Sequence, residues 1–211
     1  MKLVFDIGSN VGNFCSTYKQ KYPDCQIICV EPAYKFLGGA YANPNRGITV
    51  VPYACSDTCN EYVDFHFNEH VHTISSCNQK WISDSRFKDY NNKWVKKQVK
   101  TVTIDFLIKK FGCPDYIKVD VEGYELTALN GLTQKVPLIG LEWAEELKEE
   151  VVGCIDRLDS LGFKQFCVQD CDDYLDLPSD SDFKNYNTVR QYLVDELDSD
   201  RKEKWGMIYS R

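Results

Sequence analysis

The sequence predicts an α/β fold built on a doubly wound, mostly parallel β-sheet. Short apolar segments with the character of buried strands alternate with amphipathic segments of helical period along most of the chain. The first apolar segment also ends at an acidic residue and continues into a glycine-containing turn. Strands that alternate with helices form βαβ units, whose right-handed crossovers place helices on both faces of one sheet.

The alternation is clearest in the first third of the chain. Strands are predicted over residues 2–8, 26–32 and 47–54, and helices between them over residues 12–22 and 33–42. The next segment, about 55–102, is polar and rich in Asn, Ser and aromatic residues, with strand-like pieces at 61–67 and 94–104. We interpret this segment as an insertion between the third and fourth main strands.

The alternation resumes after the insertion. Helices are predicted over 103–112, where Gly112 ends the helix, and over 124–132, 145–162 and about 186–198. Strands are predicted over 115–121, 137–143 and 163–170, and an aromatic tail follows at 204–211. No repeat or linker interrupts this order, so we expect one domain over residues 1–211.

Size and composition fit such a domain and narrow the function. The 211 residues are 43% hydrophobic and 27% charged, with a net charge of −7, which suits a soluble protein with one core and disfavours a nucleic-acid partner. No apolar run reaches membrane-spanning length, and the apolar start is too short for a signal peptide. We therefore expect a cytoplasmic protein. Its ten cysteines lack zinc-site spacing, and we expect mostly buried free thiols.

Gly8 and Gly12 flank the turn after the first strand, which ends at Asp6. Glycine permits positive φ and a close approach of the backbone to a ligand, and the following helix start offers amide groups to a polar or anionic one. The spacing G-x-x-x-G differs from the G-x-G-x-x-G of dinucleotide sites, which disfavours a nicotinamide dehydrogenase. Purely structural glycines are the alternative.

Carboxylates follow the next two strands. Glu31 lies about twenty residues after the glycine turn, where an acidic side chain is well placed to bind ribose hydroxyls. The alternative is an acid that stabilises the helix start at Pro32. Asp57 lies past the third strand, where it could accept from an adenine amino group or cap a turn.

The stretch IKVDVEGYE carries Lys118, Asp120 and Glu122 at period 2, so an extended chain would place all three on one face. We expect this strand to lie between the first strand and the strand over 137–143, which would bring Asp6, Asp120 and Glu142 to one edge of the sheet. A lysine inside a parallel sheet needs a carboxylate partner. Lys118 should therefore pair with Asp120 or Glu142, and the pair could serve strand register alone.

All three histidines, His66, His70 and His72, fall in the insertion. Their spacing matches no standard metal site. A histidine that lines the substrate pocket is the functional reading of this cluster, and surface histidines are the alternative.

These motifs together resemble the FkbM family. VFDIGSNVGNF, CVEP, PYACSD, TIDFLIKKFGCPDYIKVDVEGYELTALNGL and GLEW occur in the order expected of that family, and D-x-E-G-x-E at 120–125 is its most specific signature. ISSCNQKWISDSRF and the terminal WGMIY also resemble one branch of it. The likeness covers essentially the whole chain.

The resemblance implies a class I methyltransferase fold, Rossmann-like, with a seven-stranded sheet that has one antiparallel strand near its C-terminus. It also implies S-adenosylmethionine as cofactor, with the methionine part at the Gly8–Gly12 turn, the ribose at Glu31 and the adenine at Asp57. The cofactor-binding residues that we assign on this basis are Asp6, Gly8, Asn10, Gly12, Glu31, Pro32, Ser56, Asp57 and Asp120.

The implied reaction is O-methylation of a hydroxyl on a sugar, glycan or other small molecule. Asp120 and Glu122 are the candidate catalytic residues, with His72 as a third. No metal ligand is assigned, although a divalent ion held by Asp120, Glu122 or Glu142 could replace a side-chain base. Because the first strand begins at residue 3, we expect no lid before it. Acceptor binding should then come from the insertion, the C-terminal loop or a second subunit.

Alternatives remain at this point. A methyltransferase that acts on nucleic acid or protein would keep the same cofactor site. A non-catalytic protein would bind the cofactor without turnover. The sequence also leaves a homodimer open.

Overall fold

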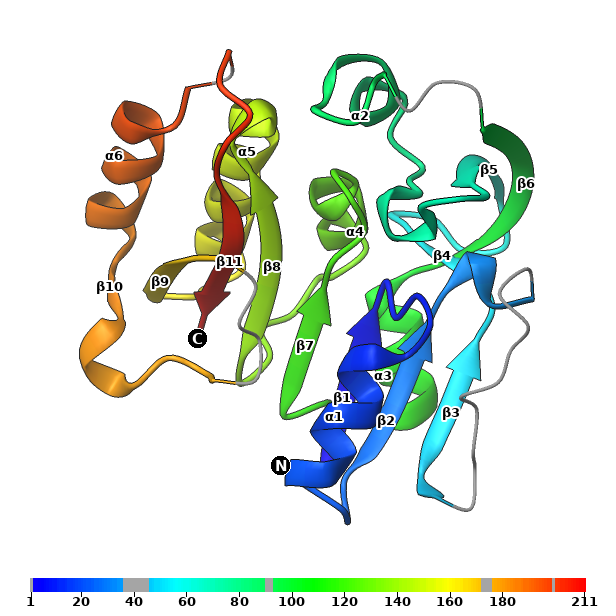
Figure 1. Cartoon of the computed structure of the whole chain (residues 1–211). Helices are drawn as coiled ribbons and strands as arrows, with labels where there is room; N and C mark the ends of the chain where they lie inside the picture. The colour runs from blue at the N-terminus through cyan, green and yellow to red at the C-terminus, as the bar shows by residue number, and fades with distance from the viewer. Residues whose placement is uncertain (1, 36–45, 90–92, 172–175, 199) are drawn as a thin grey trace.

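The computed structural model describes residues 2–35, 46–89, 93–171, 176–198 and 200–211. Its central feature is an eight-stranded sheet in the order β10-β9-β11-β8-β7-β1-β2-β3 (Figure 1). The strands are β1 Leu3–Ile7, β2 Gln26–Val30, β3 Ile48–Val51, β7 Tyr116–Val119, β8 Ile139–Ala144, β9 Gln165–Asp170, β10 Lys184–Asn185 and β11 Trp205–Ser210. β7 lies between β1 and β8 and is parallel to both, as the sequence predicts.

Helices cover both faces of this sheet. α1 (Asn13–Lys21) packs through Phe14 and Tyr18 on one face. The other face is covered by α3 (Ile104–Phe111), α4 (Glu125–Asn130), α5 (Lys148–Ser160) and α6 (Tyr186–Glu196), whose buried side chains form the larger hydrophobic core. The doubly wound α/β prediction is therefore confirmed.

The number of strands was predicted wrongly. The sheet has eight strands instead of seven, and two of them, β10 and β11, run antiparallel to β9. The additional strand is β10, whose two residues pair with Phe166 and Gln165 at the sheet edge. A two-residue strand is too short to produce a hydrophobic period, so the sequence pattern gives no sign of it.

One predicted helix is only partly testable. The helix expected over 33–42 begins in a 3₁₀ turn at Pro32–Lys35, and residues 36–45 lie outside the described residues. The other helices end within a few residues of their predicted bounds; the one expected over 145–162, for example, is a 3₁₀ turn followed by α5.

The segment expected as an insertion forms a second, three-stranded sheet. β4 (Ala54–Cys55), β6 (Trp94–Val102) and β5 (Tyr62–Asn68) lie in the order β4-β6-β5, and α2 (Gln79–Asp84) lies between β5 and β6 in sequence. In Figure 1 this sheet and α2 stand beyond the carboxyl ends of β1 and β7.

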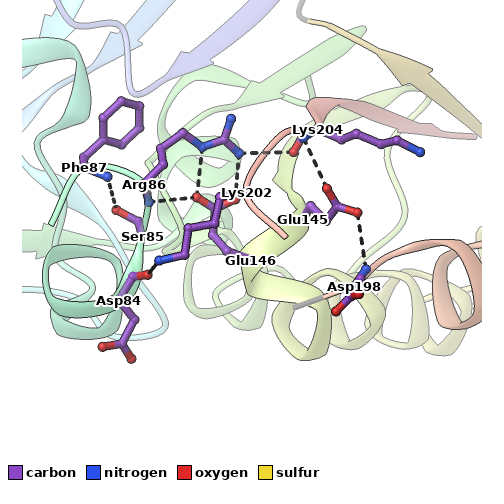
Figure 2. Close-up of polar contacts among 9 residues, drawn as sticks. All are labelled: Asp84, Ser85, Arg86, Phe87, Glu145, Glu146, Asp198, Lys202 and Lys204. Atoms are coloured by element: carbon purple, nitrogen blue, oxygen red, sulfur yellow. Dashed lines mark hydrogen bonds and ion pairs between the residues drawn. The ribbon is translucent and has the colours of Figure 1, made fainter. Parts of the chain in front are cut away.

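Arg86 attaches the end of α2 to the main sheet (Figure 2). Its guanidinium donates to both oxygens of Glu146, at 3.0 and 2.6 Å, and to the carbonyl of Lys204 at 3.2 Å. Glu145 in turn accepts from the amides of Asp198 and Lys204. The network joins three segments that are distant in sequence: the end of α2, the residues after β8 and the approach to β11. None of the described helices is both long and apolar enough to cross a membrane.

Candidate active site

An open cavity lies at the carboxyl ends of β1, β2, β7 and β8, under the insertion. It holds about 990 Å³, counted with the solvent at its mouth. Parallel strands bring their carboxyl ends to one edge, which is where ligands bind in open α/β sheets. Residues of the insertion line the other side of this space, among them Phe65, His72, Thr73, Ser75, Ser76 and Cys77.

Gly8 brings the first turn against the end of β7. Its φ is +84°, and a Cβ on it would lie 1.7 Å from the carbonyl oxygen of Asp120. Only glycine fits this position, because any side chain would displace the β7 backbone. The turn continues through Asn10, with φ 46°, to Gly12, with φ 84°, which precedes α1. Gly8 and Asn10 line the cavity, whereas Gly12 does not.

Glu31 lies in the cavity wall at the end of β2, next to Pro32, which also lines it. One carboxylate oxygen accepts from the amide of Asn10 at 2.9 Å and the other from the amide of Ala33 at 2.7 Å. Burial raises the pKa of this carboxyl group to about 7, although both amides oppose the shift. The two amides fix the orientation of the carboxylate, and each oxygen keeps a lone pair for a ligand hydroxyl.

Lys118 is buried between two carboxylates. Its Nζ donates to Asp120 Oδ2 at 2.7 Å and lies 3.9 Å from Asp6 Oδ1. The predicted pairing with Asp120 is confirmed. Asp6 is fully buried, and no hydrogen bond reaches either of its oxygens; burial raises its pKa to about 6. The buried Lys118 thus supports Asp120, and both residues line the cavity.

Three carboxylates meet beside this pair. Asp120, Glu122 and Glu142 each offer an oxygen, and these atoms all lie within 4.8 Å of one another. We call these three residues the carboxylate cluster. Burial first, and then the neighbouring Asp120, raises the pKa of both Glu122 and Glu142. The cluster can bind hydroxyl groups, take up a proton or hold a divalent cation.

Glu122 reaches the cluster by a route that the sequence did not predict. The period-2 pattern implied an extended strand, but β7 ends at Val119 and Glu122 has φ 56°. This residue and Gly123, with φ 86°, form a left-handed turn into α4. Glu125, at the start of α4, closes the turn, since its Oε1 accepts from the amides of Val121 at 2.8 Å and Gly123 at 3.3 Å.

His72 lies at the cavity, as expected for a pocket histidine. Its ring Nδ1 is buried without a hydrogen-bond partner, and its carbonyl accepts from the side chain of Asn10 at 3.2 Å. His66 and His70 do not line the cavity.

Ser56 and Asp57 lie outside the cavity lining. Ser56 is buried, donates to Asp57 at 3.1 Å, and its hydroxyl lies 3.4 Å from that of Tyr124, which does line the cavity. The adenine contact that we assigned to Asp57 is therefore not reflected in the lining, and its role stays a prediction.

Several lining residues were not found from the sequence. They include Phe14, Phe65, Ser75, Ser76, Cys77 and Tyr124. Most belong to the insertion, whose fold has no period that indicates which side chains face the sheet. The resemblance of ISSCNQKW to a family branch was the one signal at Ser76 and Cys77.

Three methyltransferases are among the solved structures to which this chain is similar. The FkbM methyltransferase of Methylobacillus flagellatus KT aligns with a TM-score of 0.53 and 14% identity, over 100% of this chain and 43% of that one. The precorrin-6y C5,15-methyltransferase of Geobacter metallireducens GS-15 has a TM-score of 0.47 and 10% identity, over 100% and 78%. The 16S rRNA (adenine(1408)-N(1))-methyltransferase of Catenulisporales acidiphilia has a TM-score of 0.44 and 14% identity, over 99% and 86%.

This chain spans less than half the length of the FkbM protein it resembles. No curated protein matches the sequence. The family model described as the methyltransferase FkbM domain matches residues 6–164, a range that holds the glycine turn, Glu31, the insertion and the carboxylate cluster. The chain therefore belongs to the FkbM methyltransferase family.

Proposed function

We propose that this protein is an S-adenosylmethionine-dependent O-methyltransferase that acts on a hydroxyl group of a sugar, a glycan or another small molecule. The observation that carries the proposal is the arrangement of one cavity. Its lining includes Gly8 and Asn10 of the glycine turn and an oriented carboxylate at Glu31, and beside them lies the carboxylate cluster.

The cavity fits the cofactor. Glu31 would accept from the ribose hydroxyls through the lone pairs that its two amide partners leave open. The backbone between Gly8 and Asn10 would face the amino-acid part, since no side chain at Gly8 stands in its way. Ala54, Cys55 and Phe65 line the same cavity and offer an apolar surface to the adenine ring. When bound, S-adenosylmethionine supplies an electrophilic methyl group on its sulfonium sulfur.

The residues of this chain would position and deprotonate the acceptor. Asp120 accepts a hydrogen bond from the reacting hydroxyl, and the contact from Lys118 holds its carboxylate in place. Glu122 takes the proton, because burial raises the pKa of its carboxyl group and a more basic carboxylate is a stronger general base. Methyl transfer needs an in-line approach, so most of the rate would come from this positioning. His72 is the alternative proton acceptor.

The acceptor is proposed to be a neutral small molecule or glycan. Lys118 is the sole Lys or Arg among the described residues that line the cavity, and it is already paired with Asp120. Phosphate-rich acceptors such as nucleic acids would meet the carboxylate cluster without a compensating cation.

Calorimetric titration with S-adenosylmethionine, S-adenosylhomocysteine and NAD tests the cofactor. The adenosyl ligands should bind and NAD should not. An acceptor screen over free sugars, glycolipids and nucleotides, read as release of S-adenosylhomocysteine, then tests the reaction. If S-adenosylmethionine binds but no acceptor leads to release of S-adenosylhomocysteine, a non-catalytic binding protein would be favoured. Loss of turnover on chelator treatment, with recovery on adding Mg²⁺, would assign the cluster to a metal.

The Asp120→Ala variant should still fold without the cofactor, because Asp6 remains as a carboxylate partner for the buried Lys118. Turnover should fall at least about a hundredfold with the loss of the positioning carboxylate. The exposed Glu196→Gln is a matched loss of one carboxylate and should keep full activity. Full activity in Asp120→Ala would remove this residue from the mechanism.

A further inference from the structure

We propose that Ser76 and Asn78, two residues of the insertion, are positioning residues that hold Glu122 in its left-handed conformation and so keep its carboxylate in the carboxylate cluster. The inference rests on the proposed function only for the use that the enzyme makes of Glu122. The positioning itself follows from contacts between the insertion and the turn after β7.

Two successive carbonyls of that turn accept hydrogen bonds from the insertion. Ser76 Oγ donates to the carbonyl of Glu122 at 2.7 Å and lies 3.4 Å from that of Val121. Asn78 Nδ2 donates to the carbonyl of Gly123 at 2.5 Å. Both peptide groups on the carboxyl side of the left-handed residues are therefore fixed from outside the main sheet.

Glu122 needs this support because it is not a glycine. At φ 56° a residue with a Cβ is disfavoured, whereas Gly123 adopts its φ of 86° freely. A residue held in such a region persists when its surroundings over-determine it, and such residues gather at functional sites. Without its two donors the turn would relax toward a right-handed or extended backbone. That change rotates the Cα–Cβ bond of Glu122 and takes its carboxylate away from Asp120 and Glu142.

The donors are themselves held by the insertion. The backbone of Ser76 exchanges both hydrogen bonds with His66 of β5, at 2.8 and 3.1 Å. Asn78 caps α2, since its side-chain Oδ1 accepts from the backbone amide of Lys80 at 2.9 Å. The backbone amide of Asn78 donates to Ser76 Oγ. The other end of α2 is attached through Arg86 and Glu146 (Figure 2). A shift of the insertion would thus reach Glu122 through two side chains.

Asn78→Asp is the sharpest test. The variant keeps the oxygen that caps α2 and removes the donor to Gly123, so the helix should stay in place. Ser76→Ala removes the other donor. Ser76→Thr retains a hydroxyl and is the conservative rescue, and Ser83→Ala removes a hydroxyl from α2 that does not touch the turn. Crystal structures and the side-chain carboxyl resonances of Asp120, Glu122 and Glu142 at fixed pH give the readout.

In Asn78→Asp and Ser76→Ala the Glu122 carboxylate should leave the cluster, with oxygen separations beyond 4.8 Å and shifted Glu122 and Glu142 resonances. On the acceptor found in the screen, kcat should fall about tenfold or more, with the Kd for S-adenosylmethionine within about twofold. Ser76→Thr and Ser83→Ala should match the wild type in every readout.

An unmoved Glu122 in a folded Asn78→Asp variant would overturn the proposal, as would equal shifts in Ser83→Ala. Because Asn78→Asp preserves the helix cap, a folding failure of Ser76→Ala leaves the test decisive. Displacement of Glu122 with unchanged kcat would uphold the positioning and contradict the proposed catalytic role of Glu122, so the two failures are distinguishable.

Discussion

Lys118 is a single buried cation among several acidic groups. Its side chain is 3% exposed, lies over the ring of Phe14 and contacts Asp120 and Asp6. Burial would lower the pKa of its ammonium group, but the two carboxylates outweigh burial and hold that pKa above its usual value. Lys118 therefore stays charged throughout the working pH range, and it is the positive charge that offsets the buried carboxylate of Asp6.

Lys118→Met should lower the free energy of unfolding by about 3–5 kcal/mol at pH 8, because Asp6 is left charged and buried without a partner. The loss should shrink below pH 6, where Asp6, with a pKa of about 6, is protonated in the folded state. Urea unfolding at both pH values measures this. Lys164→Met, at an exposed pair with Asp159, should change the free energy of unfolding by less than about 1 kcal/mol.

A comparison of Gly8 with Gly162 tests whether the close approach of the first turn to the end of β7 requires glycine. Both have positive φ, +84° and +94°, but a Cβ on Gly162 meets nothing within 4 Å. Gly162→Ala should cost about 1 kcal/mol of backbone strain. Gly8→Ala must in addition move Asp120, so it should cost several times more and abolish cofactor binding. Urea unfolding and calorimetry compare the two, and equal costs would contradict the steric argument.

At the scale of single elements, the first turn of α4 carries a pH-sensitive group. Glu125 is buried, and burial raises its pKa to about 7, although the amides of Val121 and Gly123 oppose the shift. A carboxyl pKa raised by folding adds stability below its unfolded value near 4.5, and that stability is lost as pH rises through 7. The protein should accordingly be more stable at pH 5 than at pH 8.

Glu125→Gln tests this dependence. The amide oxygen can still accept from Val121 and Gly123, but no charge is buried. We expect the variant to gain on the order of 3 kcal/mol at pH 8 relative to its effect at pH 5. Urea midpoints across this range measure the change, with exposed Glu196→Gln as control. If the free energy of unfolding changes with pH in Glu125→Gln as it does in the wild type, the pH dependence would be assigned to Glu31 and Asp6 instead.

The same elements show which features of the fold and of the site a sequence pattern can predict and which it cannot. The order β8-β7-β1 and the meeting of Asp6, Asp120 and Glu142 followed from strand alternation, because parallel strands end at one edge. The left-handed turn at Glu122 did not, since a period of 2 implies an extended chain. Ser76 and Asn78 reach this turn across more than forty residues of sequence, a contact with no local signature. Asp57 has an acidic side chain at the expected place but is not among the residues that line the cavity.

At the scale of the whole molecule, the Arg86–Glu146 pair links the insertion to the main sheet. The side chain of Glu146 is 3% exposed. Burial acts to raise the pKa of its carboxyl group, but the hydrogen bonds and the charge of Arg86, together with the amide of Glu146 itself, lower it. Arg86→Met should lower the free energy of unfolding by about 3–5 kcal/mol at neutral pH, since a buried carboxylate loses its partner. Hydrogen exchange of residues 79–88 should rise together with this loss.

The double variant Arg86→Met, Glu146→Leu separates pairing from packing. Replacing both members of a buried pair with apolar groups is often close to neutral, so most of the lost stability should return. If the double variant is as unstable as Arg86→Met, then the contact from Arg86 to the carbonyl of Lys204 is the important one.

The pairing of β1 with β7 joins segments that are distant in sequence, and we expect it to form late in folding. Leu3 and Asp115 meet across 112 residues of chain, whereas β7 and β8 are joined through α4 alone and β5 pairs with β6 within the insertion. Contacts between distant segments form late, because closing a long loop costs more entropy. We therefore expect the carboxylate cluster and the insertion to assemble first and the glycine turn to dock onto them last. On this order, we expect a ligand of that turn to stabilise the folded protein by slowing its unfolding, without raising its folding rate.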